Sequence, residues 1–303
     1  MRSRMNTRQR GIALVSVLWV LILLTLMATG LSLNSRSQAQ QSRYLTHAAQ
    51  VRHAADAGVQ LALLALAQPQ ERQPWLADGS PYLIRLDDID IRVALFNESG
   101  RIDLNAAGPE LLDGLLATAD LDDGLRAQLV DAIMDWRDGD DLRRLNGAEY
   151  DDYLAVGLDY GPANAPFPSV EEVLRVLGMT PEIYRRIRHS LTIRNPRNAI
   201  NPLYAPRQVL LALPGADETT VDQFIEDRRR SHEDGLPPPA TNIFPRQFLS
   251  GGAPGVNYTI HTEARMNTVY RYHLTASLIN RRGQAMVEQV TQESVPLFTE
   301  PDD

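Results

Sequence analysis

The chain has 303 residues, no cysteine and a formal net charge of −8. The lack of cysteine excludes disulfides and thiolate metal sites, and the acidic balance argues against a polyanionic partner such as nucleic acid. The length exceeds that of one ordinary domain, so it predicts one large or two smaller modules after the N-terminal segment.

The first 35 residues combine a basic leader with a long uncharged run. Four arginines, at positions 2, 4, 8 and 10, precede Gly11, and the next charged residue is Arg36. In a secretory signal the small-residue cleavage site follows the apolar core, whereas here the small residue precedes it. This order predicts cleavage after Gly11, with Ile12 as the new N-terminus. About 20 apolar residues are enough to cross a bilayer as a helix, and the basic leader would stay cytoplasmic. An ordinary N-terminal membrane anchor is the alternative.

This N-terminus resembles that of type IV pilin-like proteins. The resemblance implies that a prepilin peptidase cleaves between Gly11 and Ile12 and that Ile12 is N-methylated. The fifth mature residue of most family members is a glutamate, but this chain has Ser16. A carboxylate in an apolar helix is costly unless paired, and the family pairs it with the N-terminal ammonium of a neighbouring subunit during assembly. Ser16 cannot supply that charge, and its presence makes the chain similar to the type II secretion system protein K family of large minor pseudopilins.

The helix is expected to continue well beyond the apolar run. From Ile12 to about residue 67 it would be roughly 80 Å long, changing from apolar all round to amphipathic. Gly30 and Gly58 are possible bends, because glycine is a poor helix former. The residues at helical spacing are Tyr44, Ala48, Val51, Ala55, Val59, Leu63 and Leu66.

Strand signals occur in two widely separated sets. Alternation of apolar and polar residues predicts strands at 83–86 and 89–95, and again at 256–260, 270–278 and 285–290. Little strand signal lies between residues 105 and 243. Helix starts are expected there, at the capping box Ser169 to Glu172 and at Thr180-Pro181.

We therefore predict an α+β fold in which a helical domain is inserted into a small antiparallel sheet. The resemblance to protein K implies the same arrangement, a type IV pilin-like fold interrupted by a large all-α domain. The predicted divisions are a leader at 1–11, a transmembrane and stem helix at 12–67, the first part of the sheet at 68–104, the inserted domain at 105–250, and the second part of the sheet with a tail at 251–303.

The inserted domain contains a weak internal repeat, residues 102–137 and 198–229. It predicts two helical pairs, of the SAM or helix-hairpin-helix kind, that stack on each other. The Leu213-Pro-Gly215 turn resembles nucleic-acid-binding hairpins, and Arg228 to Arg230 could contact phosphate. Such binding needs a net positive surface, but carboxylates surround these arginines in the sequence, so packing is the favoured explanation of the repeat.

An acidic segment between residues 135 and 153 is the main candidate site. Its carboxylates repel each other unless they are solvated or bridged by a hard cation such as Ca²⁺, and spacing alone favours neither interpretation. The segment is not an EF-hand. The protein K family, whose α-domain holds calcium, has a Trp followed two and four residues later by Asp, and then Gly-Ala-Glu. Asp138, Asp140 and Glu149 match that pattern, and their acidic neighbours of open role are Asp135, Asp141, Asp151 and Asp152.

The six histidines are scattered and form no metalloprotease signature, so we expect no enzyme and no catalytic residue. By resemblance, the chain is a minor pseudopilin that forms the tip complex of the periplasmic pseudopilus, primes its assembly and caps it during secretion. The implied partners are minor pseudopilins of the I and J types, the major pseudopilin and the prepilin peptidase. The implied location is the inner membrane, crossed once, with the C-terminal domain in the periplasm. The alternative is a membrane-anchored helix-hairpin-helix protein of DNA uptake.

Overall fold

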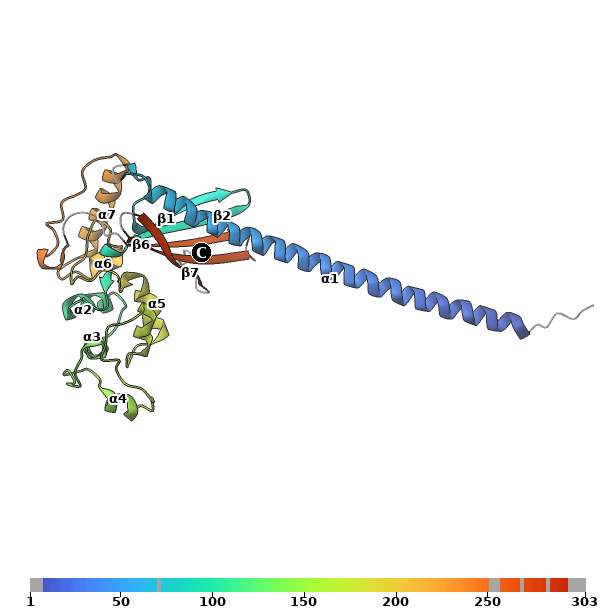
Figure 1. The fold of residues 1–303 in the computed structure, drawn as a ribbon, viewed down its shortest axis with the longest axis horizontal. Helices are drawn as coiled ribbons and strands as arrows, with labels where there is room; N and C mark the ends of the chain where they lie inside the picture. Colours follow the sequence, from blue (N-terminus) through green and yellow to red (C-terminus); the bar gives the residue numbers. More distant parts are fainter. Residues whose placement is uncertain (1–7, 70–71, 251–256, 268–269, 282–283, 294–303) are drawn as a thin grey trace, which may run out of the picture.

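A computed structural model of the chain describes residues 8–69, 72–250, 257–267, 270–281 and 284–293. A long N-terminal helix runs as a rod onto one face of a β-sheet, and a helical domain lies beyond the end of that sheet (Figure 1). The predicted α+β class, with a helical insert between two groups of strands, agrees with this arrangement.

The rod is helix α1 (Arg8–Leu66). Its C-terminal half packs on the sheet and buries Val51, Ala55 and Val59, which are among the residues that the helical spacing selected. Helix α1 continues through Gly58 without interruption. A Cβ atom at this position would lie 3.0 Å from the Thr262 side chain, so glycine here lets the helix approach the sheet closely.

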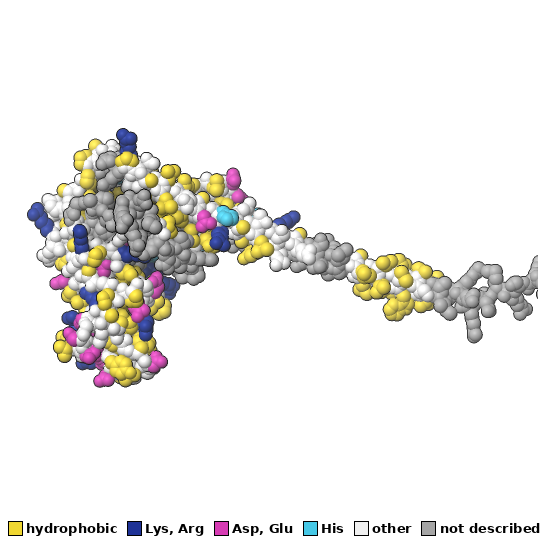
Figure 2. Space-filling model, viewed as in Figure 1, with side chains coloured by type: hydrophobic (Ala, Val, Ile, Leu, Met, Phe, Trp, Pro, Cys, Tyr) yellow, Lys and Arg dark blue, Asp and Glu magenta, His cyan; other side chains and the backbone are white. Residues whose placement is uncertain are grey.

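The N-terminal half of α1 carries exposed apolar side chains from Leu14 to Met27, visible as an apolar surface on the rod in Figure 2. Over the described residues, none of the helices combines the length and the apolar character that crossing a membrane would require. The ends of the predicted span, residues 12–13 and 30–33, lie outside the described side chains. The helix begins at Arg8, before the predicted cleavage point.

The sheet is antiparallel, with the strand order β1-β2-β5-β6-β7. Strands β2 and β5 flank the inserted domain in sequence and pair directly along their whole length, from Ile89 opposite Met266 to Asn97 opposite Tyr258. The insertion therefore leaves the sheet continuous. The strands are β1 (Asp78–Leu86), β2 (Ile89–Asn97), β5 (Tyr258–Met266), β6 (Tyr270–Arg281) and β7 (Gln284–Glu293).

Each predicted strand overlaps one of these, although residue 256 lies outside the described residues. The alternation was readable because α1 covers one face of the sheet, where Ile91, Val93 and Ile260 are buried. A half-buried sheet requires apolar residues at every second position.

The inserted domain is mainly helical. Its helices are α2 (Pro109–Ala117), α3 (Asp123–Arg137), α4 (Tyr150–Ala155), α5 (Pro181–Ile187), α6 (Arg207–Leu211) and α7 (Glu218–Glu233). The short 3₁₀-helices are η2 (Glu98–Gly100), η3 (Val170–Arg175), η4 (Arg188–Ser190) and η5 (Arg246–Phe248).

Three local expectations in this domain had different outcomes. Thr180 caps α5 as predicted, since its hydroxyl accepts a hydrogen bond of 3.2 Å from the Ile183 amide. The capping box at Ser169 is wrong: η3 follows it as a 3₁₀-helix, and the Ser169 side chain makes no capping bond. A two-residue strand, β4 (Leu191–Thr192), pairs in parallel with β3 (Ile102–Asp103), and strands this short carry no readable alternation.

The internal repeat corresponds to two helical pairs, α2 with α3 and α6 with α7, that share one hydrophobic core. The first helices of the two pairs approach very closely. A Cβ atom on Gly114 of α2 would lie only 1.9 Å from the Ala212 carbonyl oxygen, at the end of α6. The two helical pairs therefore pack directly against each other.

A candidate cation site in the inserted domain

The acidic segment lies at the end of the inserted domain that is remote from α1, where α3 leads through a loop into α4 (Figure 1). Trp136, in the last turn of α3, anchors the segment. Its ring is buried, stacks on Phe167 at a centroid distance of 6.2 Å and lies 6.0 Å from Tyr153. The cysteine-free loop is therefore held at its start by aromatic packing.

Asp135 is the most deeply placed of the candidate residues, with no exposed side-chain surface. Its Oδ2 accepts a hydrogen bond of 3.2 Å from the Arg144 amide. Its Oδ1 lies 3.2 Å from Arg144 Nε but receives no hydrogen bond. The loop backbone closes tightly over this carboxylate, because a Cβ atom on Gly147 would lie 1.9 Å from Asp135 Oδ2. Only glycine fits there.

Asp138 and Glu149 complete a group of three carboxylates with unsatisfied oxygens. Asp138 Oδ2 lies 3.2 Å from Arg144 Nη2. Asp138 Oδ1 and Glu149 Oε1 are both inaccessible and have no hydrogen-bond partner. Buried polar atoms without a partner are rare in native proteins and call for an explanation such as an ion.

The pKa values of two carboxylates in this group are also raised. The pKa of Glu149 rises from 4.5 to about 7, first because of burial and then because of the charges of Asp135, Asp138, Asp141 and Asp140. Burial likewise raises the pKa of Asp135, against the hydrogen bond from the Arg144 backbone. The carboxylates are therefore close enough to oppose each other's ionisation, which a bound cation would relieve.

The other four candidates are placed differently. Asp140 and Asp141 lie on the exposed loop, where they accept hydrogen bonds from the Leu142 amide and the Asn164 side chain. Asp152 Oδ2 accepts a hydrogen bond from the Glu149 amide, and this bond caps the start of α4. Asp152 Oδ1 lies 2.9 Å from Arg143 Nη1. Asp151 is exposed on α4. The structure thus gathers Asp135, Asp138 and Glu149 and leaves Asp151 outside.

In the arrangement seen here, no three carboxylate or histidine side chains of the described residues are close enough to share a metal ion. A cation already lies among them, since the Arg144 guanidinium contacts both Asp135 and Asp138. The donor set still fits a hard cation, because three carboxylate oxygens lack hydrogen bonds and carboxylates are the preferred ligands of such ions.

Sequence reasoning assigned no role at this site to Arg144, Gly147 or Arg137. Arg144 and Gly147 act on Asp135 from across the loop, and Arg137 holds the loop's start by donating hydrogen bonds to the Leu104 and Ala107 carbonyls. The Gly-Ala-Glu motif was a signal for Gly147. For Arg144, the sequence did not indicate which of the surrounding carboxylates the side chain would contact.

The three consecutive arginines of α7 are engaged within the protein. Arg228 is buried and paired with Asp78 at 2.5 Å. Arg229 and Arg230 both contact Glu226. These contacts commit Arg228 to the interior and place a carboxylate beside Arg229 and Arg230.

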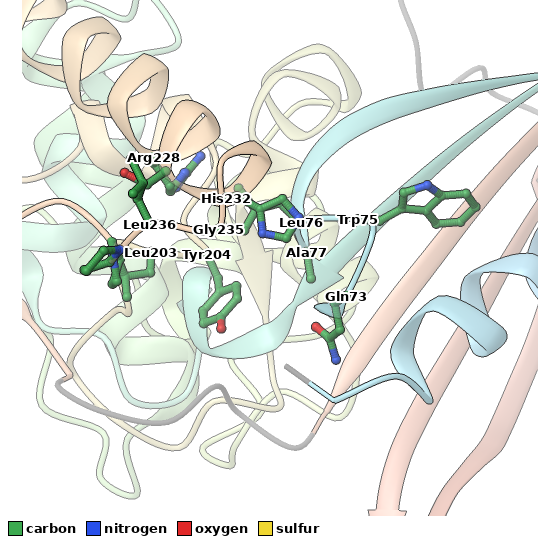
Figure 3. Close-up of a pocket in the computed structure, with 13 residues that line it drawn as sticks. Gln73, Trp75, Leu76, Ala77, Leu203, Tyr204, Arg228, His232, Gly235 and Leu236 are labelled. Carbon is green, nitrogen blue, oxygen red and sulfur yellow. The ribbon is translucent and has the colours of Figure 1, made fainter. Parts of the chain in front are cut away.

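A pocket of about 470 Å³ lies where the connection between α1 and β1 meets the end of α7 (Figure 3). Its walls include Trp75, Tyr204, His232 and Leu236. Arg228 also lines it, but this side chain is committed to Asp78. Among the described residues that line the pocket, His232 has no carboxylate beside it.

Comparisons with known proteins cover parts of the sheet and of the inserted domain, including the acidic segment. The family model described as "Type II secretion system (T2SS), protein K" matches residues 93–197, which include the end of β2, the acidic loop and α4. The chain is 30% identical over 202 residues to the putative type II secretion system protein K of Escherichia coli K12, covering 60% of this chain and 62% of that protein. It is 29% identical over 258 residues to type II secretion system protein K of Pseudomonas aeruginosa, covering 76% and 77%. The match thus spans less than two thirds of the Escherichia coli relative.

Among solved structures, the fold is similar to a chain of the GspK-GspI-GspJ complex from the type II secretion system of enterotoxigenic Escherichia coli. The TM-score is 0.53 at 16% identity, covering 86% of this chain and 100% of that one. The matches make the chain similar to components of the type II secretion system. Within that class its relatives are the proteins K, and residues 93–197 match the protein K family model.

Proposed function

We propose that this protein is a minor pseudopilin of the type II secretion system that forms the tip complex of the pseudopilus, primes its assembly and caps it. The observation that carries this proposal is the combination of the family match over residues 93–197 with a fold similar to a chain solved in the GspK-GspI-GspJ complex. The role is structural and requires no catalytic residue.

The partners follow from the same comparison. The chain of similar fold was solved with GspI and GspJ, so we expect this protein to bind the corresponding minor pseudopilins of its own system, and the major pseudopilin below them. Co-expression with those two partners and affinity purification on a tag placed on one of them tests this. Recovery of a stable three-protein complex is expected, and its absence would contradict the tip-complex assignment.

Membrane anchoring and processing are part of the proposal. The exposed apolar side chains between Leu14 and Met27 have no cover within the described chain, and a lipid or a neighbouring helix would remove them from water. We expect one crossing of the inner membrane, with the sheet and the inserted domain in the periplasm. Carbonate extraction of membranes tests this, since the protein should stay in the pellet.

The position in the fibre rests on Ser16 and on the inserted domain. Ser16 lies exposed on α1 and provides no carboxylate for the N-terminal ammonium of a subunit ahead of it, so the leading position suits this protein. The inserted domain projects beyond the end of the sheet (Figure 1), where it would obstruct a subunit stacked above. Electron microscopy of sheared pseudopili with labelled subunits should show label at one end, and label along the shaft would contradict this.

We further propose that the acidic segment binds calcium, with Asp135, Asp138 and Glu149 as the central ligands and Asp140 and Asp141 beside them. The support is the set of inaccessible carboxylate oxygens without hydrogen bonds and the mutual pKa perturbation. The ion would fix the loop between α3 and α4. Because a ligand bound only to the folded state stabilises it by mass action, a chelator should lower the melting temperature.

Two substitutions sharpen that test. Asp138→Asn should abolish most of the difference between calcium and chelator, whereas the exposed Asp151→Asn should leave it unchanged. Identical unfolding of the wild-type protein in calcium and in chelator would leave the loop as a merely solvated acidic segment.

Two finer features of the fold complete the proposal. We interpret α1 and the sheet as a type IV pilin-like unit, and the two stacked helical pairs as SAM or helix-hairpin-helix-like repeats. The support is the packing of α1 on one face of an antiparallel sheet and the contact of Gly114 with the end of α6.

A further inference from the structure

One arginine side chain joins the two carboxylates at the centre of the acidic segment. Arg144 Nε lies 3.2 Å from Asp135 Oδ1, and its Nη2 lies 3.2 Å from Asp138 Oδ2. Asp135 is fully buried, and a buried carboxylate can stay ionised only beside a compensating positive charge. In the arrangement described here, Arg144 supplies that charge.

We propose that Arg144 competes with the cation for Asp135 and Asp138. In the metal-free protein its guanidinium neutralises these two carboxylates, and when the cation binds, the guanidinium moves into solvent. This inference rests on the proposed calcium site and adds a regulatory element to it. Arg144 sets the affinity of the site by making metal binding an exchange of one positive charge for another.

The geometry permits this movement without disturbing the loop. The Arg144 backbone is fixed, because its amide donates to Asp135 Oδ2 and its carbonyl accepts a hydrogen bond of 3.2 Å from the Gly147 amide. The Arg144 side chain is 41% exposed. Rotation of the side chain alone would therefore carry the guanidinium out, while the amide kept its hold on Asp135.

Chemistry makes the movement necessary. Calcium binds through oxygen atoms at about 2.3–2.6 Å, and a guanidinium offers only hydrogen-bond donors. It cannot become a ligand, and it repels a divalent ion at short range. The oxygens of Asp135 and Asp138 that contact Arg144 belong to the same carboxylates that the ion would use, so the two cations exclude each other.

The neighbouring arginine supplies a matched control. Arg143 carries the same charge on the same loop, but it pairs with Asp152 at 2.9 Å. Asp152 in turn accepts the hydrogen bond from the Glu149 amide that caps α4. Arg143 therefore supports the helix start, whereas among the described residues the ion pairs of Asp135 and Asp138 are made by Arg144.

The experiment is calcium titration calorimetry on the purified, chelator-stripped full chain. Arg144→Gln should tighten calcium binding by roughly three- to tenfold, the range expected from removing one or two half-exposed ion pairs. Arg143→Gln should leave the affinity close to that of the wild type. In chelator, Arg144→Gln should also melt below the wild type, because Asp135 loses its counter-ion, so calcium should raise its melting temperature by more.

The outcomes separate this inference from the site itself. A wild-type protein that binds no calcium would overturn the proposed site. A wild type that binds, together with an Arg144→Gln protein of equal or weaker affinity, would overturn only the competition. Should Arg144→Gln fail to fold, Arg144→Lys serves instead. An ammonium cannot bridge two carboxylates as the planar guanidinium does. The Arg144→Lys protein should therefore bind calcium more tightly than the wild type, and equal or weaker calcium binding contradicts the inference.

Discussion

Arg228 Nη2 on α7 lies 2.5 Å from Asp78 Oδ2 at the start of β1, and both side chains are only 3% exposed. The same guanidinium donates to the Pro202 and Ala205 carbonyls. This buried ion pair fixes the inserted domain to the edge of the sheet, since its partners lie in both.

Arg228→Met should destabilise the protein by about 3–5 kcal/mol, because it leaves the Asp78 carboxylate buried without a counter-charge. Urea unfolding followed by circular dichroism measures the loss. Arg229→Met is the control, since its exposed pair with Glu226 should contribute at most about 1 kcal/mol. Equal losses for the two variants would show that the buried pair has no special role.

Gly114→Ala should destabilise the inserted domain by about 1–3 kcal/mol, the usual effect of forcing extra volume into a packed interior. The added methyl group would lie 1.9 Å from the Ala212 carbonyl oxygen, which would separate the two helical pairs. Gly124→Ala in α3 meets only the Asp122 side chain at 3.2 Å, and alanine favours a helix by up to about 1 kcal/mol. Thermal unfolding of both variants should therefore shift in opposite directions, and parallel shifts would contradict the packing explanation.

The pH dependence of the metal-free protein should reveal Glu149. Its pKa in the folded state is about 7, raised from 4.5 mainly by burial, so the folded protein retains a proton that the unfolded chain releases. The free energy of unfolding should therefore fall as the pH rises from about 4.5 to about 7. Urea unfolding in chelator across this range measures the fall. Glu149→Gln should flatten it, and so should calcium, because the ion favours the ionised carboxylate. A wild-type stability that rises across the window would be inconsistent with the shifted pKa.

Processing between Gly11 and Ile12 remains a prediction. We expect N-terminal sequencing of protein from a host with a prepilin peptidase to begin at Ile12. Gly11→Leu should leave the leader attached, because a bulky side chain would replace the small residue before the cut. A host without the peptidase supplies the control, and an intact leader in the first host would disprove the assignment.

The sequence by itself determined the elements whose signal is local. The alternation at 83–86 and 89–95 identified β1 and β2, and helical spacing identified the buried face of α1 at Val51, Ala55 and Val59. Thr180 was recognisable as a cap because a cap bonds an amide only three residues away. The insertion of a helical domain was equally visible, since the two groups of strands stand far apart in the chain.

Tertiary structure decided the rest, because contacts between distant residues leave no periodic pattern. The sequence made Gly58 a possible bend, whereas packing makes it a point of close approach to Thr262. The sequence offered seven acidic candidates, of which the resemblance singled out Asp138, Asp140 and Glu149. In the structure, Asp135 and Asp138 both contact Arg144, whereas Asp151 is exposed to solvent. The role of a carboxylate depends on whether its oxygens are removed from water and on the charges around them.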